Sequence, residues 1–176
     1  VMDRKADCSV ALTALREGKL PLSVTHNDTK LNNVLIDEAT GEGICIIDLD
    51  TTMPGLSIYD FGDSIRFGAN HSAEDEKDLT KVNFDIDLYR IYTRGFLEGA
   101  AGGLTDAELE YLPWGAKLMT LECGIRFLTD YLDGDNYFHI RYPEQNLDRT
   151  RTQFKLVSDM EQQWDEMHKI VREIAQ

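Results

Sequence analysis

The sequence is poor in cysteine, proline and basic residues. Its 176 residues include three cysteines, four prolines and 18 lysines and arginines, against 32 aspartates and glutamates. Cys8, Cys45 and Cys123 are odd in number, far apart and set mostly among apolar residues, so we expect buried, reduced thiols. The formal net charge of −14 would repel the phosphates of DNA or RNA. We therefore exclude nucleic acid as a partner.

Long apolar runs are missing as well. No stretch approaches the roughly 18 residues that a membrane helix requires, and the charged segment Val1–Lys5 has no apolar signal-peptide core. We therefore expect a cytoplasmic protein with no membrane partner. The four histidines lack zinc-binding spacing. With 42% hydrophobic residues, the chain can form one domain with a sizeable core.

The apolar pattern predicts an α+β domain that is mainly helical. Two short apolar runs, Val34–Ile36 and Ile44–Ile47, flank a turn-forming segment and predict a small β hairpin. Helical periodicity covers residues 6–18, 58–69, 84–98, 116–133 and 147–174. We divide the single domain, 1–176, into a leading helix (1–20), a hairpin region (21–57) and a helical part (58–176).

Polar residues cluster where this hairpin opens. Asp28 lies on the segment that enters the first strand, and Asp48 follows the second. In an antiparallel hairpin, the residue numbers of two facing residues have a constant sum. If the turn is centred near residues 40 and 41, this sum is about 81, and Asn33 lies across from Asp48. Carboxylate and amide oxygens of this kind suit Mg²⁺. Asp28 could then accept a proton from a substrate hydroxyl, and Lys30 could neutralise a transferring phosphoryl group.

This arrangement resembles a known catalytic signature. The pattern His26-x-Asp28-x-Lys30-x-x-Asn33, followed by Ile47-Asp48-Leu49-Asp50, is similar to the catalytic loop and metal-binding aspartate of protein-kinase-like enzymes. The Asp-Leu-Asp form resembles the aminoglycoside phosphotransferase and choline kinase branch. The segments HNDTKLNN, IDLDTTMPGLSIYDFGDSIRFGA and GAKLMTLECGIRFLTDYLDGDNYF resemble the bacterial N-acetylhexosamine 1-kinases, and the similarity runs from about residue 20 to residue 170.

The resemblance implies a protein-kinase-like C-terminal lobe that moves the γ-phosphate of ATP to the anomeric hydroxyl of a sugar. Asp28 would be the catalytic base, with Lys30 beside it, and Asn33 and Asp48 would bind Mg²⁺. The resemblance further implies structural support of the site by His26 and Asp60, and sugar contacts by Arg126 and Tyr137. Asp50 is a further candidate for substrate binding.

One part of the family pattern is missing. Nothing before residue 20 resembles a Gly-rich phosphate loop, and no predicted strand carries a lysine. We therefore expect the N-terminal lobe to be absent, the chain alone to be inactive, and the bare lobe interface to allow self-association.

Three alternatives remain open at this point. The acceptor could be another alcohol, such as choline, homoserine or an aminoglycoside. The run Ile44–Thr52 also fits the nucleophile motif of haloacid-dehalogenase-type phosphatases, with Asp48 attacking phosphate, although that fold needs further strands downstream. The chain could also be a non-catalytic binding module. Arg126 has a simpler interpretation too, since Glu122 and Asp130 lie four residues to either side and could pair with it.

Overall fold

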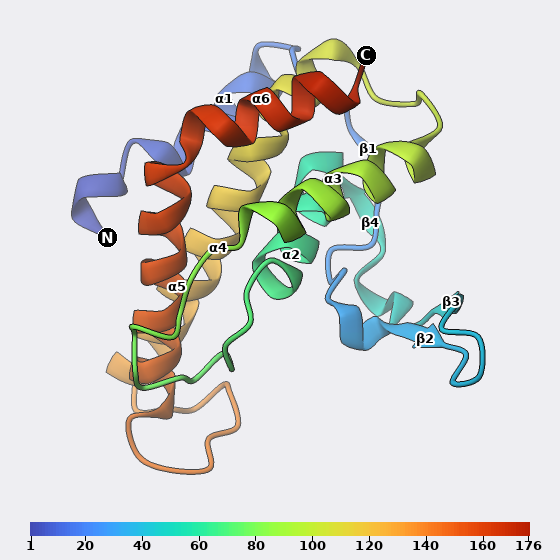
Figure 1. Cartoon of the computed structure of the whole chain (residues 1–176). Helices are drawn as coiled ribbons and strands as arrows, with labels where there is room; N and C mark the ends of the chain where they lie inside the picture. The colour runs from blue at the N-terminus through green and yellow to red at the C-terminus, as the bar shows by residue number, and fades with distance from the viewer.

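The computed structural model covers residues 1–176 and consists of packed helices with two small sheets at one edge (Figure 1). None of the helices combines the length and the apolar character that crossing a bilayer requires. The helices are α1 (Val10–Arg16), α2 (Ser57–Gly68), α3 (Ile86–Ala100), α4 (Asp106–Leu132), α5 (Gln145–Gln162) and α6 (Trp164–Ile174), with 3₁₀ turns at Met2–Arg4, Asp7–Ser9, Leu31–Asn33 and Leu49–Thr51. A mainly helical α+β fold is thus confirmed.

Helix α4 is the longest element, and α2 packs closely against it. A capping box begins α4, because the Thr105 side chain accepts from the Glu108 N–H while the Glu108 carboxylate accepts from the Thr105 N–H at 2.8 Å. Where α2 and α4 meet, a Cβ on Gly62 would collide with the carbonyl of Gly115. A Cβ on Gly115 would likewise collide with the Ile58 carbonyl. The two glycines therefore set the distance between these helices.

The predicted hairpin is confirmed, but its register differs from the expected one. Strand β2 (Val34–Ile36) pairs antiparallel with β3 (Gly43–Ile46). The Ile47 N–H donates to the Asn33 carbonyl at 2.9 Å, so Asn33 lies opposite Ile47 and not Asp48. The prediction was wrong by one position.

The turn explains the shift of register. The Asp37 carboxylate accepts hydrogen bonds from the backbone N–H groups of Ala39 and Thr40, at 2.9 and 2.8 Å. This side-chain-stabilised turn is typical of aspartate, and it moves the centre of the loop toward the first strand. An irregularity between Leu35 and Ile36 adds a further change in the pairing.

A second sheet was not predicted. Strand β1 (Ser23–Thr25) pairs antiparallel with β4 (Met53–Gly55). Strands of three residues are too short to show a period of two in the sequence. This pairing brings together the two ends of the segment 26–52. The loop before β2 therefore begins, and the turn after β3 ends, at the same small sheet.

The predicted helix over residues 147–174 is wrong, because it is two helices. Gln163 leaves the helical conformation (φ −107°, ψ 17°) between α5 and α6. Its side-chain amide donates to the Phe84 carbonyl at 3.2 Å. Trp164 then packs edge-on against Trp114, with ring centroids 4.9 Å apart. The break turns α6 sharply away from the direction of α5 (Figure 1).

The N-terminal segment, expected as one helix, contains short 3₁₀ turns and α1. An ion-pair cluster attaches it to the helices. Glu161 on α5 binds Arg4 at 2.6 Å and Lys117 of α4 at 2.9 Å, and Lys117 also contacts Asp7 at 2.9 Å. Because the Lys117 side chain is only 9% exposed, these two carboxylates compensate a nearly buried charge.

The β2–β3 hairpin projects from the helical body, and both of its faces are exposed (Figure 1). Cys45 on β3 is exposed, as is Cys8, and Cys123 is half-buried, so the expectation of buried thiols was wrong while that of free thiols is confirmed. Exposed apolar side chains gather on these strands and their neighbours, and we call them the hairpin surface: Val24, Leu35, Ile36, Ile44, Ile46, Leu49 and Met53.

Candidate active site

The loop between β1 and β2 is held by one carboxylate of α2. Asp60, in the first turn of that helix, accepts from the backbone N–H groups of His26 and Asn27, each at 2.8 Å. Asn27 has a left-handed backbone (φ 64°), which is uncommon outside glycine. The two hydrogen bonds to a charged acceptor stabilise this sharp turn. Asp60 thereby fixes the direction in which the next residue, Asp28, leaves the turn.

His26 connects the loop to the end of β3. Its Nε2 lies 3.0 Å from the Ile47 carbonyl, and its Nδ1 accepts from the Asp28 N–H at 3.2 Å. A carbonyl only accepts and an amide N–H only donates, so these contacts assign the donor role to Nε2 and the acceptor role to Nδ1. The Thr51 hydroxyl also donates to the His26 carbonyl at 2.6 Å. His26 therefore joins three segments by hydrogen bonds.

Asp28 is the central carboxylate of the loop. Its Oδ2 accepts from Lys30 Nζ at 2.6 Å and from Asn33 Nδ2 at 2.8 Å, and its side chain is 27% exposed. Partial burial raises the pKa of Asp28, but the hydrogen bonds from Lys30 and Asn33 and the charge of Lys30 outweigh burial and lower it overall. Asp28 is therefore ionised at neutral pH and still reaches solvent.

Asn33 and Asp48 supply oxygen atoms at the adjoining strand ends. Asn33 is buried, and its Nδ2 also donates to the Asp28 carbonyl at 2.8 Å. Since a carboxylate and a carbonyl can only accept, the amide orientation is fixed and Oδ1 is directed away from Asp28. Asp48 has a left-handed backbone (φ 62°), is exposed and does not cap its own turn.

The oxygen atoms of Asn33 and Asp48 suit some metal ions and not others. Nowhere in the chain are three or more His, Cys, Asp or Glu side chains grouped to hold an ion, so a closed structural site of the zinc type does not fit. Mg²⁺ takes one or two carboxylates and completes its shell with water and phosphate. Asn33 and Asp48 offer one amide and one carboxylate oxygen, the donor types that such an open site uses.

A cavity of about 620 Å³ opens beside Asp28. Its walls come from the 26–33 loop, α2, α4, the loop before α3, the loop before α5, and α5. Residues that line it include Asp28, Lys30, Arg66, Phe67, Glu74, Cys123, Arg126, Phe127, Tyr137, Phe138, His139 and Arg149. Two of the expected substrate contacts, Arg126 and Tyr137, are thus placed in one cavity with Asp28. Asp50 is exposed and is not part of this lining.

Arg126 and Tyr137 lie against each other on the cavity wall. Arg126 Nη2 is 3.5 Å from the Tyr137 hydroxyl, and its Nε is 3.7 Å from Glu122. Of the two pairings that helical spacing allows for Arg126, the one with Glu122 is present and the one with Asp130 is not. Asp130 is buried and accepts from the backbone N–H groups of residues 136–138, at 2.8 to 2.9 Å. This bonding fixes the loop that carries Tyr137.

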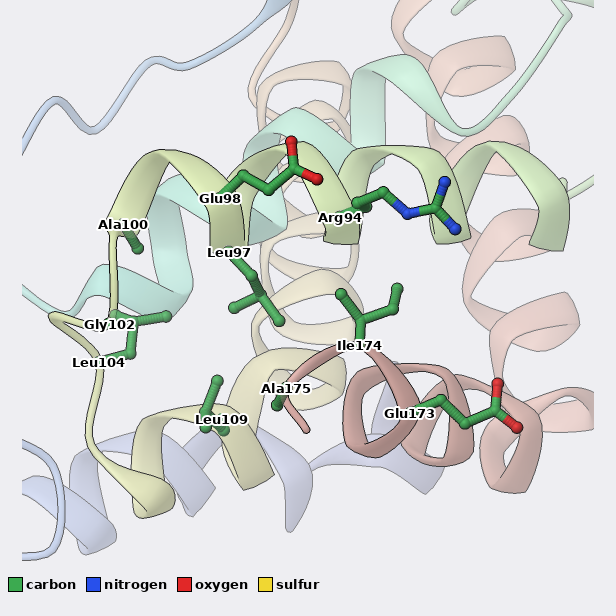
Figure 2. A pocket seen from close by; sticks show the side chains of 10 residues that line it. All are labelled: Arg94, Leu97, Glu98, Ala100, Gly102, Leu104, Leu109, Glu173, Ile174 and Ala175. Carbon is green, nitrogen blue, oxygen red and sulfur yellow. The ribbon is translucent and has the colours of Figure 1, made fainter.

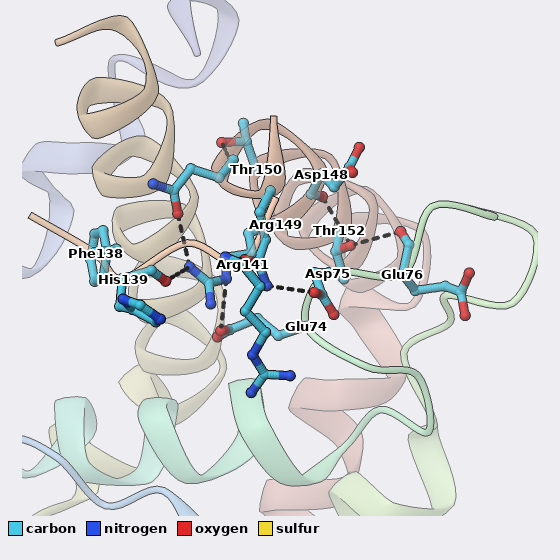
Figure 3. Close-up of polar contacts among 12 residues, drawn as sticks. Glu74, Asp75, Glu76, Phe138, His139, Arg141, Asp148, Arg149, Thr150 and Thr152 are labelled. Carbon is cyan, nitrogen blue, oxygen red and sulfur yellow. Dashed lines mark hydrogen bonds and ion pairs between the residues drawn. The ribbon is translucent and has the colours of Figure 1, made fainter. Parts of the chain in front are cut away.

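The sequence interpretation missed a second set of polar residues in this cavity. Arg66 Nη1 donates to Glu74 at 3.0 Å, and the other oxygen of Glu74 lies 3.7 Å from Arg149 Nε. Figure 3 shows Arg149 between Glu74 and the 138–141 loop. These residues belong to a helix, a loop and a distant helix, so no spacing in the sequence connects them.

Another cavity, of about 470 Å³, lies between the end of α3, the start of α4 and the end of α6 (Figure 2). Leu97, Leu109 and Ile174 form its apolar part, and Arg94 and Glu98 lie at its edge. It contains none of the residues of the 26–33 loop. The cavity beside Asp28 is therefore the candidate active site.

A comparison with protein families agrees with this location. Residues 4–92, slightly more than half of the chain, match the family model described as the phosphotransferase enzyme family. The chain belongs to this family. The matched part of the phosphotransferase includes the 26–33 loop, both sheets and α2. It is thus an enzyme of a family that transfers phosphate to small molecules.

The phosphatase alternative does not fit the fold. A haloacid-dehalogenase-type site needs Asp48 at the end of a strand in a parallel sheet with further strand–helix units downstream. Both sheets of the phosphotransferase are two-stranded and antiparallel, and after β4 the named elements are all helices.

Proposed function

We propose that the phosphotransferase moves the γ-phosphate of ATP to a hydroxyl of a small molecule, with the anomeric hydroxyl of an N-acetylhexosamine as the acceptor. The observation that carries this proposal is the position of Asp28. An ionised carboxylate borders the cavity, and Lys30 and Asn33 donate hydrogen bonds to it. A base and a cation therefore border one end of the cavity, and Asn33, which donates to the base, lies next to them without lining it.

In the proposed reaction, the acceptor hydroxyl donates a hydrogen bond to Asp28, and its oxygen attacks the γ-phosphorus. The bond from phosphorus to the β–γ bridging oxygen breaks, and the hydroxyl proton passes to Asp28. Because the pKa of Asp28 is lowered, it is a weak base, and orienting the hydroxyl is its main contribution. Mg²⁺, held by Asn33 and Asp48, would neutralise phosphate charge.

Lys30 would stabilise the transferring phosphoryl group. His26 and Asp60 would keep the loop in shape, since their hydrogen bonds end on its backbone. Arg126 and Tyr137 would contact the sugar on the far wall. The volume of the cavity, about 620 Å³, is ample for a monosaccharide. Asp50 has no role in this proposal.

The hairpin surface is the proposed side for the nucleotide. It adjoins Asn33 and Asp48, and its apolar side chains are 47–81% exposed. We propose that the adenine end of ATP and a further lobe cover it. Residues 1–176 alone are then expected to bind the acceptor, to turn it over poorly, and to self-associate through this surface.

The test is Asp28→Asn, made in the complete reading frame that encodes the chain. Turnover with ATP, Mg²⁺ and N-acetylglucosamine should fall by roughly 10²- to 10⁴-fold, while the affinity for the sugar, measured by calorimetry, should stay the same. Asp37→Asn is the matched control, because Asp37 also accepts two hydrogen bonds but stabilises only the hairpin turn. A parallel loss of turnover and sugar affinity would contradict the proposed role of Asp28.

A further inference from the structure

The side chain of Asn27 joins two turns of the candidate active site. Its Nδ2 donates to the Thr51 carbonyl at 2.9 Å, and its Oδ1 accepts from the Thr25 hydroxyl at 2.9 Å. In return, the Thr51 hydroxyl donates to the carbonyl of His26, the residue before Asn27, at 2.6 Å. Residues 26 and 27 are thus bonded to Thr51 in both directions, and we call these two bonds the Asn27–Thr51 clamp.

The clamp connects the segments that carry the two carboxylates of the site. Asp28 directly follows Asn27, and Thr51 lies three residues after Asp48, at the end of a 3₁₀ turn. A further bond, from His26 Nε2, ends on the backbone carbonyl directly before Asp48, at 3.0 Å. Asp48 is therefore flanked along the chain by two cross-links to the loop that carries Asp28.

Two neighbouring strands leave space for the Asn27 side chain. Thr25 on β1 is buried, and its hydroxyl lies 2.9 Å from Asn27 Oδ1 and 3.0 Å from the Met53 carbonyl. A Cβ on Gly55, in β4, would collide with this hydroxyl and come within 3.2 Å of Asn27 Oδ1. Glycine at position 55 therefore leaves the room in which Thr25 and Asn27 meet.

The backbone conformation of Asn27 alone does not account for these contacts. Its φ of 64° is one that glycine adopts readily and that asparagine tolerates. Glycine would meet this requirement without any side chain. The carboxamide of Asn27 uses both its oxygen and its NH₂ group, which bond to Thr25 and Thr51. The side chain thus links segments in addition to what the backbone does.

We infer that the Asn27–Thr51 clamp keeps Asp28 and Asp48 at a fixed separation. Asn27 and Thr51 are positioning residues, because they act through these two carboxylates. The consequence for catalysis rests on the proposed function, whereas the coupling between the two segments is a property of the chain alone. Without the clamp, Asp48 can shift relative to Asp28, so turnover and the use of metal should suffer while acceptor affinity stays the same.

The first test is Asn27→Gly in the complete reading frame that encodes the chain. Glycine keeps the left-handed turn and removes the carboxamide, so kcat should fall about 3- to 10-fold, the range for one neutral hydrogen bond. The Mg²⁺ concentration for half-maximal turnover should rise by a similar factor, and acceptor affinity, measured by calorimetry, should not change. Ala101→Gly is the matched control, since Ala101 is also left-handed (φ 48°) but lies at the end of α3, and it should alter none of these.

Thr51→Val tests the bond in the other direction, because valine is similar in size to threonine but lacks the hydroxyl. It should lower kcat and raise the Mg²⁺ requirement, and Thr51→Ser, which keeps the hydroxyl, should restore both. Since Asn27 and Thr51 also border the cavity, direct contact with the acceptor is the competing role. That role predicts weaker acceptor binding with an unchanged Mg²⁺ requirement, and such a result would overturn the inference.

Amide hydrogen exchange of residues 1–176 tests the coupling without any turnover. Asn27→Gly should speed exchange in residues 47–53, which include the Thr52 N–H bonded to the Leu49 carbonyl at 3.0 Å. Thr51→Val should speed exchange in residues 26–33. In each case the change is made in one segment and measured in the other, while exchange in α4 should stay native. Unchanged exchange in the second segment overturns the inference, and so does faster exchange in α4, which would show a general loss of stability.

The proposed function fails on a different measurement, namely undiminished phosphoryl transfer by Asp28→Asn. That outcome would leave the exchange result on the clamp standing. Conversely, an absence of coupling in the exchange experiment would leave the role of Asp28 standing. The two failures are therefore separable.

Discussion

The hydrogen bonds of Asp60 allow a quantitative prediction for Asp60→Asn. The native carboxylate accepts from two successive backbone N–H groups at 2.8 Å. In the variant, one amide oxygen can still accept, but the NH₂ group faces a donor. The loss of one hydrogen bond to a charged group, with its donor left unpaired, should cost about 2–3 kcal/mol. Because the bonds hold the turn before Asp28, this cost applies to the active conformation of the loop.

If the cost appears as a lower population of that conformation, kcat/KM should fall by about 30- to 150-fold. Phosphoryl transfer in the complete reading frame measures the activity, and urea unfolding measures the stability. Asp85→Asn is the matched control, since Asp85 also accepts two backbone N–H bonds, from Asp87 and Leu88 at 2.9 and 3.0 Å, but at the start of α3. Asp85→Asn should leave kcat/KM unchanged. A stable Asp60→Asn variant with native kcat/KM would refute the argument that α2 holds the loop through this carboxylate.

Three further predictions concern the metal, pH and packing. Asp48→Asn should raise the Mg²⁺ concentration for half-maximal turnover by about 10- to 100-fold and leave acceptor affinity unchanged. An unchanged Mg²⁺ requirement would exclude Asp48 as a ligand. The hydrogen bond from Arg4, followed by that from Lys117, lowers the pKa of Glu161 from 4.5 to about 2, so its stabilisation is complete above pH 4.5 and is lost as the pH falls toward 2. Urea unfolding across this range should show a loss of about 2 kcal/mol that is absent in Glu161→Gln, and identical pH profiles would contradict it. Gly62→Ala should destabilise the fold by about 1–3 kcal/mol or more in thermal unfolding, because its Cβ would meet the Gly115 carbonyl; Gly95→Ala, with open space at its Cβ, should be neutral or stabilising.

The parts of the site that the sequence predicted are those encoded within a short stretch of chain. Asp28, Lys30 and Asn33 lie within six residues, and their mutual hydrogen bonds follow from this closeness. The hairpin was also predictable, because two apolar runs flank a turn-forming segment. Its register was not, since the Asp37 side chain competes for the backbone of the turn.

The parts that could not be predicted depend on contacts between distant segments. Arg66, Glu74 and Arg149 meet only after α2, the following loop and α5 have packed together. The break at Gln163 is similar, because its side chain bonds to Phe84, 79 residues away. Helical periodicity continues through this position, so the sequence alone predicted one helix. Cys45 was expected in a core because its neighbours are apolar, yet those neighbours are themselves exposed on the hairpin.

Helix α2 contacts both the 26–33 loop and the cavity wall. These two contacts limit how the acceptor preference could change during evolution. Its first turn holds the backbone of the loop through Asp60, and Arg66, six residues and about 9 Å further along the same rigid rod, forms part of the cavity wall. Glycine at position 62, between the two, lets the helix lie directly against the backbone of α4. Replacements that move this helix would therefore disturb catalysis and selectivity together. The 133–144 loop, which carries Tyr137, makes no hydrogen bond to α2, so replacements there would alter the cavity wall without moving this helix.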